Sequence, residues 1–398
     1  MNEKKKLQPK VRFREFTGEN APDWEQRKLG EIAKDSIGGG TPKTEVVDYW
    51  DGNLPWIQSS DLLEHKLDTV EIKKKISYKG LENSAAKLVP ANSIAIVTRV
   101  GVGKLAIIPF DYSTSQDILS LCYLKINKFF AAYLIYSVIQ RQLKFIQGTS
   151  IKGITKSELL NFNLLLPESL SEQECIGNLL KKIDKLITLH QRKLEQLEQL
   201  KNTLLSKMFP KSGTNIPEIR FSGFTDAWKQ RKLGEVVNRF DNLRIPITES
   251  SRISGSTPYY GANGIQDYVE GYTHDGEYIL IAEDGANDIN NYPVFRVHGK
   301  IWVNNHAHVL QTIDGIADND YVAYALKSIN IGPYLVGGSR PKLNADSLMK
   351  LEIKLPKLSE QIKIGKIFLR IDYQIENYSQ KLKNLKTAKK SLLDKLFI

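Results

Sequence analysis

Several short stretches of this sequence contain residue types that could carry out catalysis. Gly101-Val102-Gly103-Lys104 has the glycines and the lysine of a phosphate-binding loop, but such a loop also needs glycine where the chain has Thr98 and a hydroxyl where it has Leu105. His306 and His308 are two residues apart and could bind a metal from one face of a strand, but no third ligand is evident. The sequence therefore argues against nucleotide binding, and it favours a structural role for the histidines.

Motifs of DNA-modifying enzymes are weak or missing. Pro22-Asp23 with Glu71-Ile72-Lys73 has the residue types of one nuclease motif, but patterns this short occur by chance. An adenine methyltransferase needs an Asn/Asp-Pro-Pro-aromatic loop to hold the amino group of the flipped base. The chain has no Pro-Pro, and Asn291-Tyr292-Pro293-Val294 does not replace it. We therefore expect no catalytic residue in this chain.

Other side chains are of the types that bind the edges of DNA bases. Arginine and lysine bond guanine, asparagine and glutamine bond adenine, and small hydroxyls bond either. The net charge of +11 suits an acidic partner, either nucleic acid or an anionic membrane surface. We expect DNA-binding residues in turn-rich loops at Ser59, Ser60, Arg99, Lys104, Thr149, Ser150, Lys152, Arg244, Tyr259, Tyr260, Asn263, Asn305, Arg340 and Lys342. The alternative is that these loops only close each domain.

The elements that must position these loops occur twice. WEQRKLGEI at 24–32 returns as WKQRKLGEV at 228–236, and residues 172–209 overlay 360–397 without a gap. This offset is too long for a solenoid repeat and indicates two domains, each followed by its own helix. The repeated phrase itself, with Trp24 and Trp228, is expected to pack rather than to contact DNA. The predicted parts are an N-terminal extension at 1–19, a first domain at 20–167, a spacer helix at 168–209, a linker at 210–217, a second domain at 218–356 and a second spacer helix at 357–398.

Both predicted helices carry a coiled-coil seam. Apolar residues recur in alternating steps of four and three from Ile176 to Met208, and again from Ile364 to Leu396. Because a whole domain lies between the two helices in the chain, the second helix can return antiparallel to the first.

Polar residues near these seams raise separate questions. Ser171 or Ser359 is expected to cap its helix. Lys201 and Lys389 occupy equivalent seam positions, where a lysine is expected to set the register. The alternative is that Lys389 and its neighbours contact phosphate, because the second helix has nine basic residues and four acidic ones.

Between the repeated edges the two halves differ. Short apolar runs such as 93–100, 104–110, 277–285 and 300–310 predict strands, and 128–147 and 319–330 predict helices. The predicted fold class is α+β: two mixed α/β domains with pseudo-twofold symmetry, joined by two long antiparallel coiled-coil helices. Constant frames around unlike interiors suit two modules that read two different DNA half-sequences, with a helical spacer between them.

Composition also limits the compartment. Cys122 and Cys175 fit neither a metal site nor a disulfide framework, which favours a reducing cytoplasm. The N-terminus has no apolar core of a secretory signal, and the longest apolar run, 129–139, is about half of a bilayer crossing. We therefore expect a cytoplasmic chain with no membrane partner.

An ordered set of phrases resembles the specificity (S) subunit of Type I restriction–modification systems over about residues 20–398. The phrases are WEQRKLGEI, GGTPKTEVVDYWDGNLPWIQSSDL, LPESLSEQ, YYGANGIQDYV, ILIAEDGA, WVNNHAHVL and GGSRPKLNADSLMKLEIKLPKLSEQ. No single phrase is decisive, but their order along the chain is specific to that family.

The resemblance implies a non-catalytic subunit with two target recognition domains. Each domain would read one half of a bipartite, asymmetric site in double-stranded DNA. The helices would set the spacer and dock two modification (M) subunits that methylate adenine N6, and restriction (R) subunits would join them in host defence. S-adenosylmethionine, ATP and magnesium are expected on those partners and not on this chain. A self-sufficient enzyme, a stand-alone DNA-binding protein and a coiled-coil adaptor that binds only proteins are the alternatives.

Overall fold

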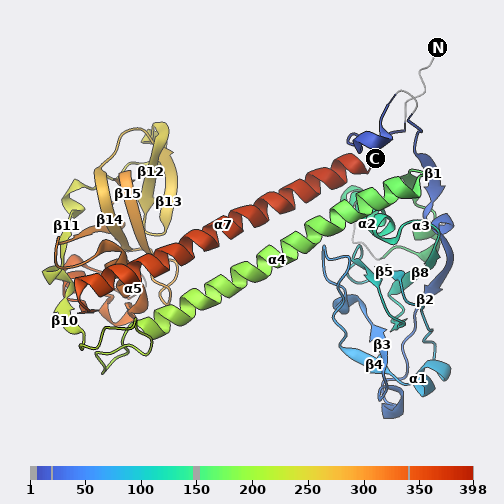
Figure 1. Ribbon diagram of the computed structural model, residues 1–398, viewed down its shortest axis with the longest axis horizontal. Coiled ribbons are helices and arrows are strands. Elements are labelled where there is room, and N and C mark those ends of the chain that lie inside the picture. The colour runs from blue at the N-terminus through green and yellow to red at the C-terminus, as the bar shows by residue number, and fades with distance from the viewer. Residues whose placement is uncertain (1–6, 19–20, 147–152, 339–340, 398) are drawn as a thin grey trace. The chain divides into compact units, whose positions relative to one another are not determined.

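The computed structural model of the chain describes residues 7–18, 21–146, 153–338 and 341–397. The chain divides into two compact units, Met1–His190 together with Lys381–Ile398, and Gln191–Gln380. Each unit holds one mixed α/β body and a segment of each of the two longest helices, α4 (Leu170–Met208) and α7 (Leu358–Leu396) (Figure 1). The predicted α+β class and the two long helices are confirmed.

The body of the first unit contains three small sheets. An antiparallel sheet has the strand order β2-β8-β5-β6, a second sheet has the order β4-β3-β7, and β1 pairs with β9. The strands are β1 (Glu25–Lys28), β2 (Ala33–Gly38), β3 (Leu54–Ile57), β4 (Lys74–Ile76), β5 (Ser93–Val97), β6 (Leu105–Ile108), β7 (Ser113–Thr114), β8 (Ile118–Leu124) and β9 (Asn163–Leu166). The helices are α1 (Tyr78–Glu82), α2 (Lys128–Ile146) and α3 (Lys156–Leu160).

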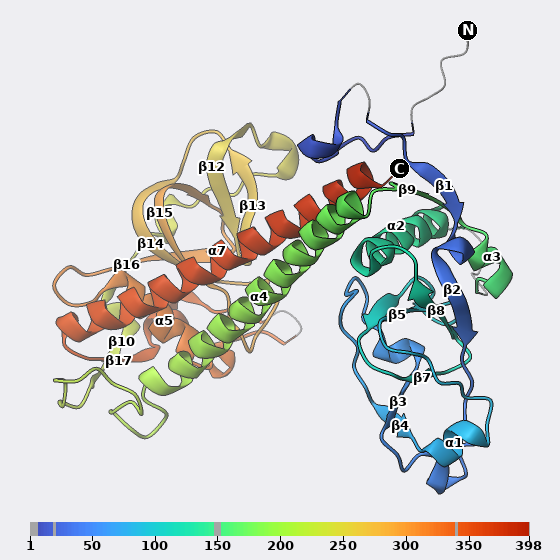
Figure 2. The same ribbon diagram turned by 45° about the vertical axis from the view of Figure 1, so that its right-hand side comes forward.

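Helix α2 is the centre of the first unit's core. All side chains from residue 130 to residue 139 are buried, because the helix packs on β5, β6 and β8 and also contacts segments of α4 and α7 (Figure 2). A helix that is apolar on every side has to be covered on every side. The prediction of one buried helix in this run is confirmed. Among the described residues, no helix is long and apolar enough to cross a membrane.

The body of the second unit is built on one six-stranded sheet in the order β11-β16-β14-β15-β12-β13, with β10 paired to β17 beside it. The strands are β10 (Lys229–Lys232), β11 (Val237–Arg239), β12 (Ser254–Gly261), β13 (Gly264–Val269), β14 (His274–Ala282), β15 (Val294–Val303), β16 (Ala307–Thr312) and β17 (Glu352–Leu355). The helices are α5 (Asn319–Ser328) and α6 (Ala345–Met349). The two bodies therefore differ in sheet topology, as their unlike interior sequences imply.

The repeated nine-residue phrase forms the same packing frame in both units. β1 pairs antiparallel with β9, and β10 pairs antiparallel with β17. Trp24 and Trp228 precede these strands and are 1% and 2% exposed, and Leu29 and Leu233 follow them with no exposed surface. The expectation that the phrase packs is confirmed.

The acid of each Ser-Glu-Gln phrase is buried against an arginine. Glu172 accepts hydrogen bonds from Nε and Nη2 of Arg12, both at 2.7 Å, and Glu360 accepts the same two bonds from Arg220 at 2.7 and 2.8 Å. The paired side chains in the first unit are 4% and 1% exposed. The residues before each tryptophan are therefore tied to the start of a long helix by a two-point ion pair.

The glutamine of the same phrase joins two helix starts. Gln173 accepts a bond from the Asn127 N–H at 2.9 Å, just before α2, and Gln361 accepts one from the Asp318 N–H at 3.0 Å, just before α5. The expectation that Ser171 or Ser359 caps its helix is wrong, because both serines lie inside their helices. Ser169 precedes the helix and accepts the Glu172 N–H at 3.3 Å.

The far end of each long helix carries a second repeated contact. In the first unit, Lys389 forms an ion pair with Asp184 at 2.6 Å, and Asp184 also accepts the Tyr133 hydroxyl at 2.6 Å. In the second unit, Lys201 pairs with Asp372 at 2.6 Å, and Asp372 accepts the Tyr324 hydroxyl at 2.6 Å. In each unit, this contact joins a segment of α4 to a segment of α7.

These contacts decide between the two interpretations of the seam lysines. Lys389 is 9% exposed and its ammonium group already faces a carboxylate. For Lys389 itself the phosphate alternative is therefore contradicted, and the packing interpretation agrees with the structure. Phosphate contact by its basic neighbours stays a prediction.

A glycine in each long helix allows the close approach of the body's helix. A Cβ at Gly177 would lie 2.8 Å from the backbone nitrogen of Phe130, and a Cβ at Gly365 would lie 2.7 Å from Cβ of Asp320. Both distances are shorter than any tolerated contact. The glycine is retained in both repeats because α2 and α5 begin against it.

Candidate nucleic-acid interface

In the second unit, several loops meet where β14 ends and β16 begins. The Glu283 N–H donates to the carbonyl of His306 at 2.9 Å, and the Leu343 N–H donates to the carbonyl of Glu283 at 2.7 Å. The Asn263 side chain, in the turn between β12 and β13, donates to the carbonyl of Gly285 at 2.9 Å. We call this edge of the sheet the loop rim. It brings together the predicted residues Arg244, Asn263, Asn305 and Lys342.

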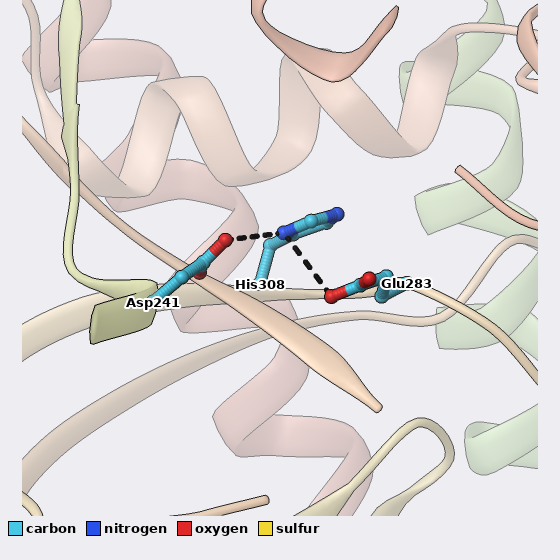
Figure 3. A group of neighbouring side chains, drawn as sticks. All are labelled: Asp241, Glu283 and His308. Carbon is cyan, nitrogen blue, oxygen red and sulfur yellow. Dashed lines mark hydrogen bonds and ion pairs between the residues drawn. The ribbon is translucent and has the colours of Figure 1, made fainter. Parts of the chain in front are cut away.

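A buried charged cluster supports the loop rim (Figure 3). One oxygen of Glu283 lies 2.7 Å from Arg244 Nη1, and the other lies 2.7 Å from Lys342 Nζ. His308 Nδ1 lies 2.6 Å from Asp241 and 3.7 Å from Glu283. The side chains of His308, Asp241 and Glu283 are 1%, 11% and 13% exposed. Residues from four separate parts of the sequence are therefore tied together by charge.

Both ring nitrogens of His308 have a partner inside the protein. Its Nδ1 faces the Asp241 carboxylate, and its Nε2 lies 2.8 Å from the carbonyl oxygen of Leu343. A backbone carbonyl only accepts hydrogen bonds, so Nε2 of His308 donates to Leu343. With Nδ1 held by Asp241, the ring links β16 to residue 343.

The same arrangement does not fit a metal ion. Asp241, Glu283 and His308 offer possible ligand atoms that all lie within 4.8 Å of one another. Nδ1 of His308 already faces Asp241, so a metal ion bound there would have to replace this contact. The two carboxylates already face the cations Arg244 and Lys342. His306 bonds Asp284 at 2.5 Å instead of joining His308, so the structural role expected for the histidines agrees with the geometry.

The cluster also shifts the ionisation of its two acids. Burial opposes the charge of Asp241, but the hydrogen bond and the positive charge of His308 outweigh it and lower the pKa of Asp241 below its usual value. Burial likewise opposes the charge of Glu283, but bonds from Lys342 and Arg244 leave its pKa lowered. Both acids are therefore held in the charged form.

Two predicted DNA-binding residues are used inside the protein. Arg244 is 15% exposed, and its Nη1 also donates to the carbonyl of Ala307 at 2.9 Å. Tyr259 is 1% exposed, and its hydroxyl donates to the carbonyl of Ile247 at 3.2 Å. Their polar groups are paired within the protein, so in this conformation neither side chain can bond a base. For these two residues the expectation of base contact is corrected.

The other predicted residues of this unit lie at or near the surface. Asn305 and Asn263 are exposed, the Lys342 side chain is 42% exposed, and Tyr260 is half-buried. Asn263 also accepts the Asn287 N–H at 3.0 Å, which fixes the neighbouring loop. Contact of these residues with DNA stays a prediction.

The structure adds exposed polar residues that the sequence interpretation missed. Asn287, Asn290, Asn291 and His306 lie exposed on the loops of the rim. Asparagine is the residue type that bonds adenine through two hydrogen bonds. The stretch DGANDINNYP, with several asparagines between two strands, carried the signal that could have identified them.

In the first unit, the glycine-rich stretch that resembled a phosphate loop is the hairpin between β5 and β6. Gly101 and Gly103 have φ of 88° and 97°, and the Val97 N–H donates to the carbonyl of Lys104 at 2.9 Å. A phosphate-binding loop leads from a strand into a helix, whereas this turn leads into another strand. The argument against nucleotide binding is therefore supported. Arg99 is exposed in this hairpin.

Other loops of the first unit lie beside that hairpin. The Ile154 N–H donates to the carbonyl of Thr98 at 2.7 Å, and the Thr98 N–H donates to the carbonyl of Asp117 at 2.8 Å. Ser59 and Ser60 follow β3, whose Ile57 carbonyl accepts the Ser115 N–H at 2.9 Å. Segment 115–117 thus connects the hairpin to the serines. Thr41 and Gln116, which bond each other at 2.8 Å, are exposed there and were not predicted.

Some expectations fall outside these contacts. Thr149, Ser150, Lys152 and Arg340 lie outside the described residues and stay predictions. Asp23 of the nuclease-like motif accepts a bond from Gln8 at 3.1 Å, whereas Glu71 lies 4.0 Å from Lys73. The two acids of that motif therefore have different partners.

The chain belongs to the Type I restriction modification DNA specificity domain family, whose sequence model matches residues 22–199 and again residues 225–387. The two matches cover both repeats found in the sequence. The resemblance to Type I specificity subunits is therefore confirmed.

Individual relatives agree with the family match. A putative type I restriction enzyme specificity subunit of Haemophilus influenzae is 43% identical over 157 residues, which cover 39% of this chain and 40% of the relative. The Type I restriction enzyme EcoprrI specificity subunit of Escherichia coli is 26% identical over 84% of each chain. The crystal structure of the S subunit from M. genitalium superimposes with a TM-score of 0.71 at 18% identity, over 98% of this chain and 99% of that one. This last likeness supports the fold.

Proposed function

We propose that the chain is the DNA-specificity subunit of a Type I restriction–modification enzyme and that each of its two bodies reads one half of a bipartite, asymmetric DNA site. The observation that carries this proposal is the repeated frame around unlike interiors. The Arg–Glu pair, the Lys–Asp–Tyr contact and the buried tryptophan recur in both units, whereas the sheets differ. The constant frame supports the DNA-binding loops of both units in the same way. The different loops let each unit read a different DNA sequence.

The partners follow from the same proposal. Two modification subunits dock on the helices and carry S-adenosylmethionine for methylation of adenine N6. Restriction subunits join them and use ATP and magnesium. The chain itself supplies sequence choice and spacing, and its exposed asparagines and basic residues are the groups that would contact the DNA.

Methylation mapping tests the proposal. The chain is co-expressed with its neighbouring modification subunit in a host without adenine methylation, and the genome is sequenced for N6-methyladenine. We expect a two-part motif with a fixed gap that is absent when this chain is omitted. A stable complex without any such motif would overturn the proposal.

The alternatives give different outcomes. Methyl transfer or DNA cleavage by the purified chain alone would indicate a self-sufficient enzyme. Binding of the partner without any affinity for DNA would indicate an adaptor. Specific binding in the absence of any modification subunit, with no methylation in its presence, would indicate a stand-alone DNA-binding protein.

A further inference from the structure

Lys342 and Leu343, at the end of the loop that follows Val336, are held in place by several backbone contacts. Val336 and Lys342 exchange backbone hydrogen bonds at 2.8 and 2.9 Å, which closes the base of the loop. The Leu343 N–H donates to the carbonyl of Glu283, and the Leu343 side chain is buried. The loop therefore ends on the first residue after β14.

Charged side chains add to this backbone attachment. Glu283 bonds Lys342 with one carboxylate oxygen and Arg244 with the other, both at 2.7 Å. His308 donates to the carbonyl of Leu343 at 2.8 Å while Asp241 holds its other nitrogen at 2.6 Å. Residues 342 and 343 are therefore fixed by Glu283 and by His308 at once.

The position of Glu283 makes it the branch point of the cluster. Its side chain is 13% exposed and bonds both Lys342 and Arg244. Without its charge, Lys342 would lose its ion-pair partner, and the buried Arg244 would keep only carbonyl acceptors and the more distant Asp241 at 3.7 Å. The side chain of Lys342 could then sample many rotamers.

We propose that Glu283 is a positioning residue for DNA recognition by the second unit: with His308 it fixes Lys342 and Leu343 on the loop rim. This inference rests on the proposed function for its DNA part, and on the described contacts for its structural part. A lysine held in one position can bond one base in preference to others. A mobile lysine attracts DNA by its charge but does not distinguish between bases.

The first test uses the full chain without DNA. Hydrogen exchange is compared for the wild type, Glu283→Gln and the control Glu277→Gln, an acid within β14 that is 60% exposed and faces Arg296. We expect exchange of the Lys342 and Leu343 amides to rise about tenfold or more in Glu283→Gln and to stay unchanged in the control. Unchanged exchange in Glu283→Gln overturns the positioning role, whatever the DNA result.

The second test uses the methylating complex. Glu283→Gln should relax the choice of bases in one half of the motif and lower methylation of the original site about tenfold or more. The other half of the motif should keep its sequence, and Glu283→Asp should restore most of the choice. An equal loss in both halves, or a loosened loop with an unchanged motif, would mean that the network is only structural.

The two tests separate the two ideas. A wild type without any motif contradicts the proposed function, while hydrogen exchange still decides whether Glu283 fixes the loop. If Glu283→Gln did not fold, Lys342→Met would remove the same ion pair from a side chain that is 42% exposed. Faster exchange of Leu343 in that variant would support the attachment, and unchanged exchange would count against it.

Discussion

Arg12 and Glu172 form a buried ion pair, so either side chain without its partner would be a buried, unpaired charge. Removing one partner of such a pair leaves an uncompensated charge and costs about 3–5 kcal/mol. We therefore expect Arg12→Met to lower the free energy of unfolding by about that amount in urea titrations followed by tryptophan fluorescence. The matched control is Arg14→Met, because Arg14 is exposed two residues away.

A double variant separates charge from packing. Arg12→Met combined with Glu172→Leu removes both charges, so it should be more stable than Arg12→Met alone. If the double variant were equally unstable, the loss would arise from packing and not from the unpaired carboxylate.

Asp241 and Glu283 make the second unit sensitive to acid. Their pKa values are lowered in the folded state, so the unfolded chain takes up protons first as the pH falls. The stability that they contribute is complete above about pH 4, near the unfolded values, and is lost as the pH falls through the lower folded values. In thermal unfolding between about pH 6 and pH 2, the difference in midpoint between the wild type and Asp241→Asn should therefore shrink toward acid pH. A constant difference would contradict this.

Residue type alone predicted some of the loop rim and misplaced the rest. Arg244 and Lys342 were selected because they bond guanine, and both lie at the loop rim. The side-chain groups that bond a base also bond a carboxylate. The sequence does not reveal that Glu283 lies close enough to bond both Arg244 and Lys342. Tyr259 was misplaced because strand pairing decides which face a side chain takes, and that register depends on distant strands.

Among the elements, the two long helices depend on a glycine that a propensity scale would penalise. Alanine favours an exposed helix by about 1 kcal/mol over glycine. At Gly177 the new Cβ would meet the backbone of Phe130 at 2.8 Å, and at Gly365 it would meet Asp320 at 2.7 Å. We expect Gly177→Ala and Gly365→Ala each to destabilise the protein by about 1–3 kcal/mol, the usual cost of overpacking.

A control on the same helix keeps this test specific. Asn202→Ala lies at an exposed position of α4 and should be neutral or slightly stabilising in the same thermal unfolding assay. If Gly177→Ala were as stable as the wild type, the close approach of α2 would not constrain this position.

Elements with strong periodicity were predictable, and those defined by pairing were less so. The seams of both long helices and the apolar run of α2 gave clear signals because each repeats over many turns. The run at 300–310 was predicted as strand throughout, but residues 304–306 turn and separate β15 from β16. The turn consists of the polar residues Asn304, Asn305 and His306, and this polarity was the signal in the sequence for a break in the strand.

At the scale of the whole molecule, the repeated frame implies that recognition is modular. Replacing residues 240–345 with the interior of another family member should change one half of the methylated motif and leave the other half unchanged. Methylation mapping of the exchanged chain checks this. An unchanged motif, or a change in both halves, would contradict the assignment of one half-site to each unit.

The two-domain organisation was readable because the duplication is written in the sequence. Arg12 and Arg220, or Asp184 and Asp372, occupy equivalent places in the two repeats and make equivalent contacts. What the repeats could not reveal is the different sheet inside each unit, because the interiors share no pattern. The six-stranded order of the second unit depends on pairing between strands far apart in the chain.

The first unit is assembled from two distant parts of the chain, which affects the order of events during synthesis. Its core includes Leu396 and Phe397, and Phe397 packs edge-on against Phe130 at 5.6 Å between ring centres. The ribosome makes these residues after residues 191–380. All residues of the second unit are therefore synthesised before the last core residues of the first unit. We expect pulse proteolysis of a chain shortened by residues 391–398 to cut the first unit faster and to spare the second.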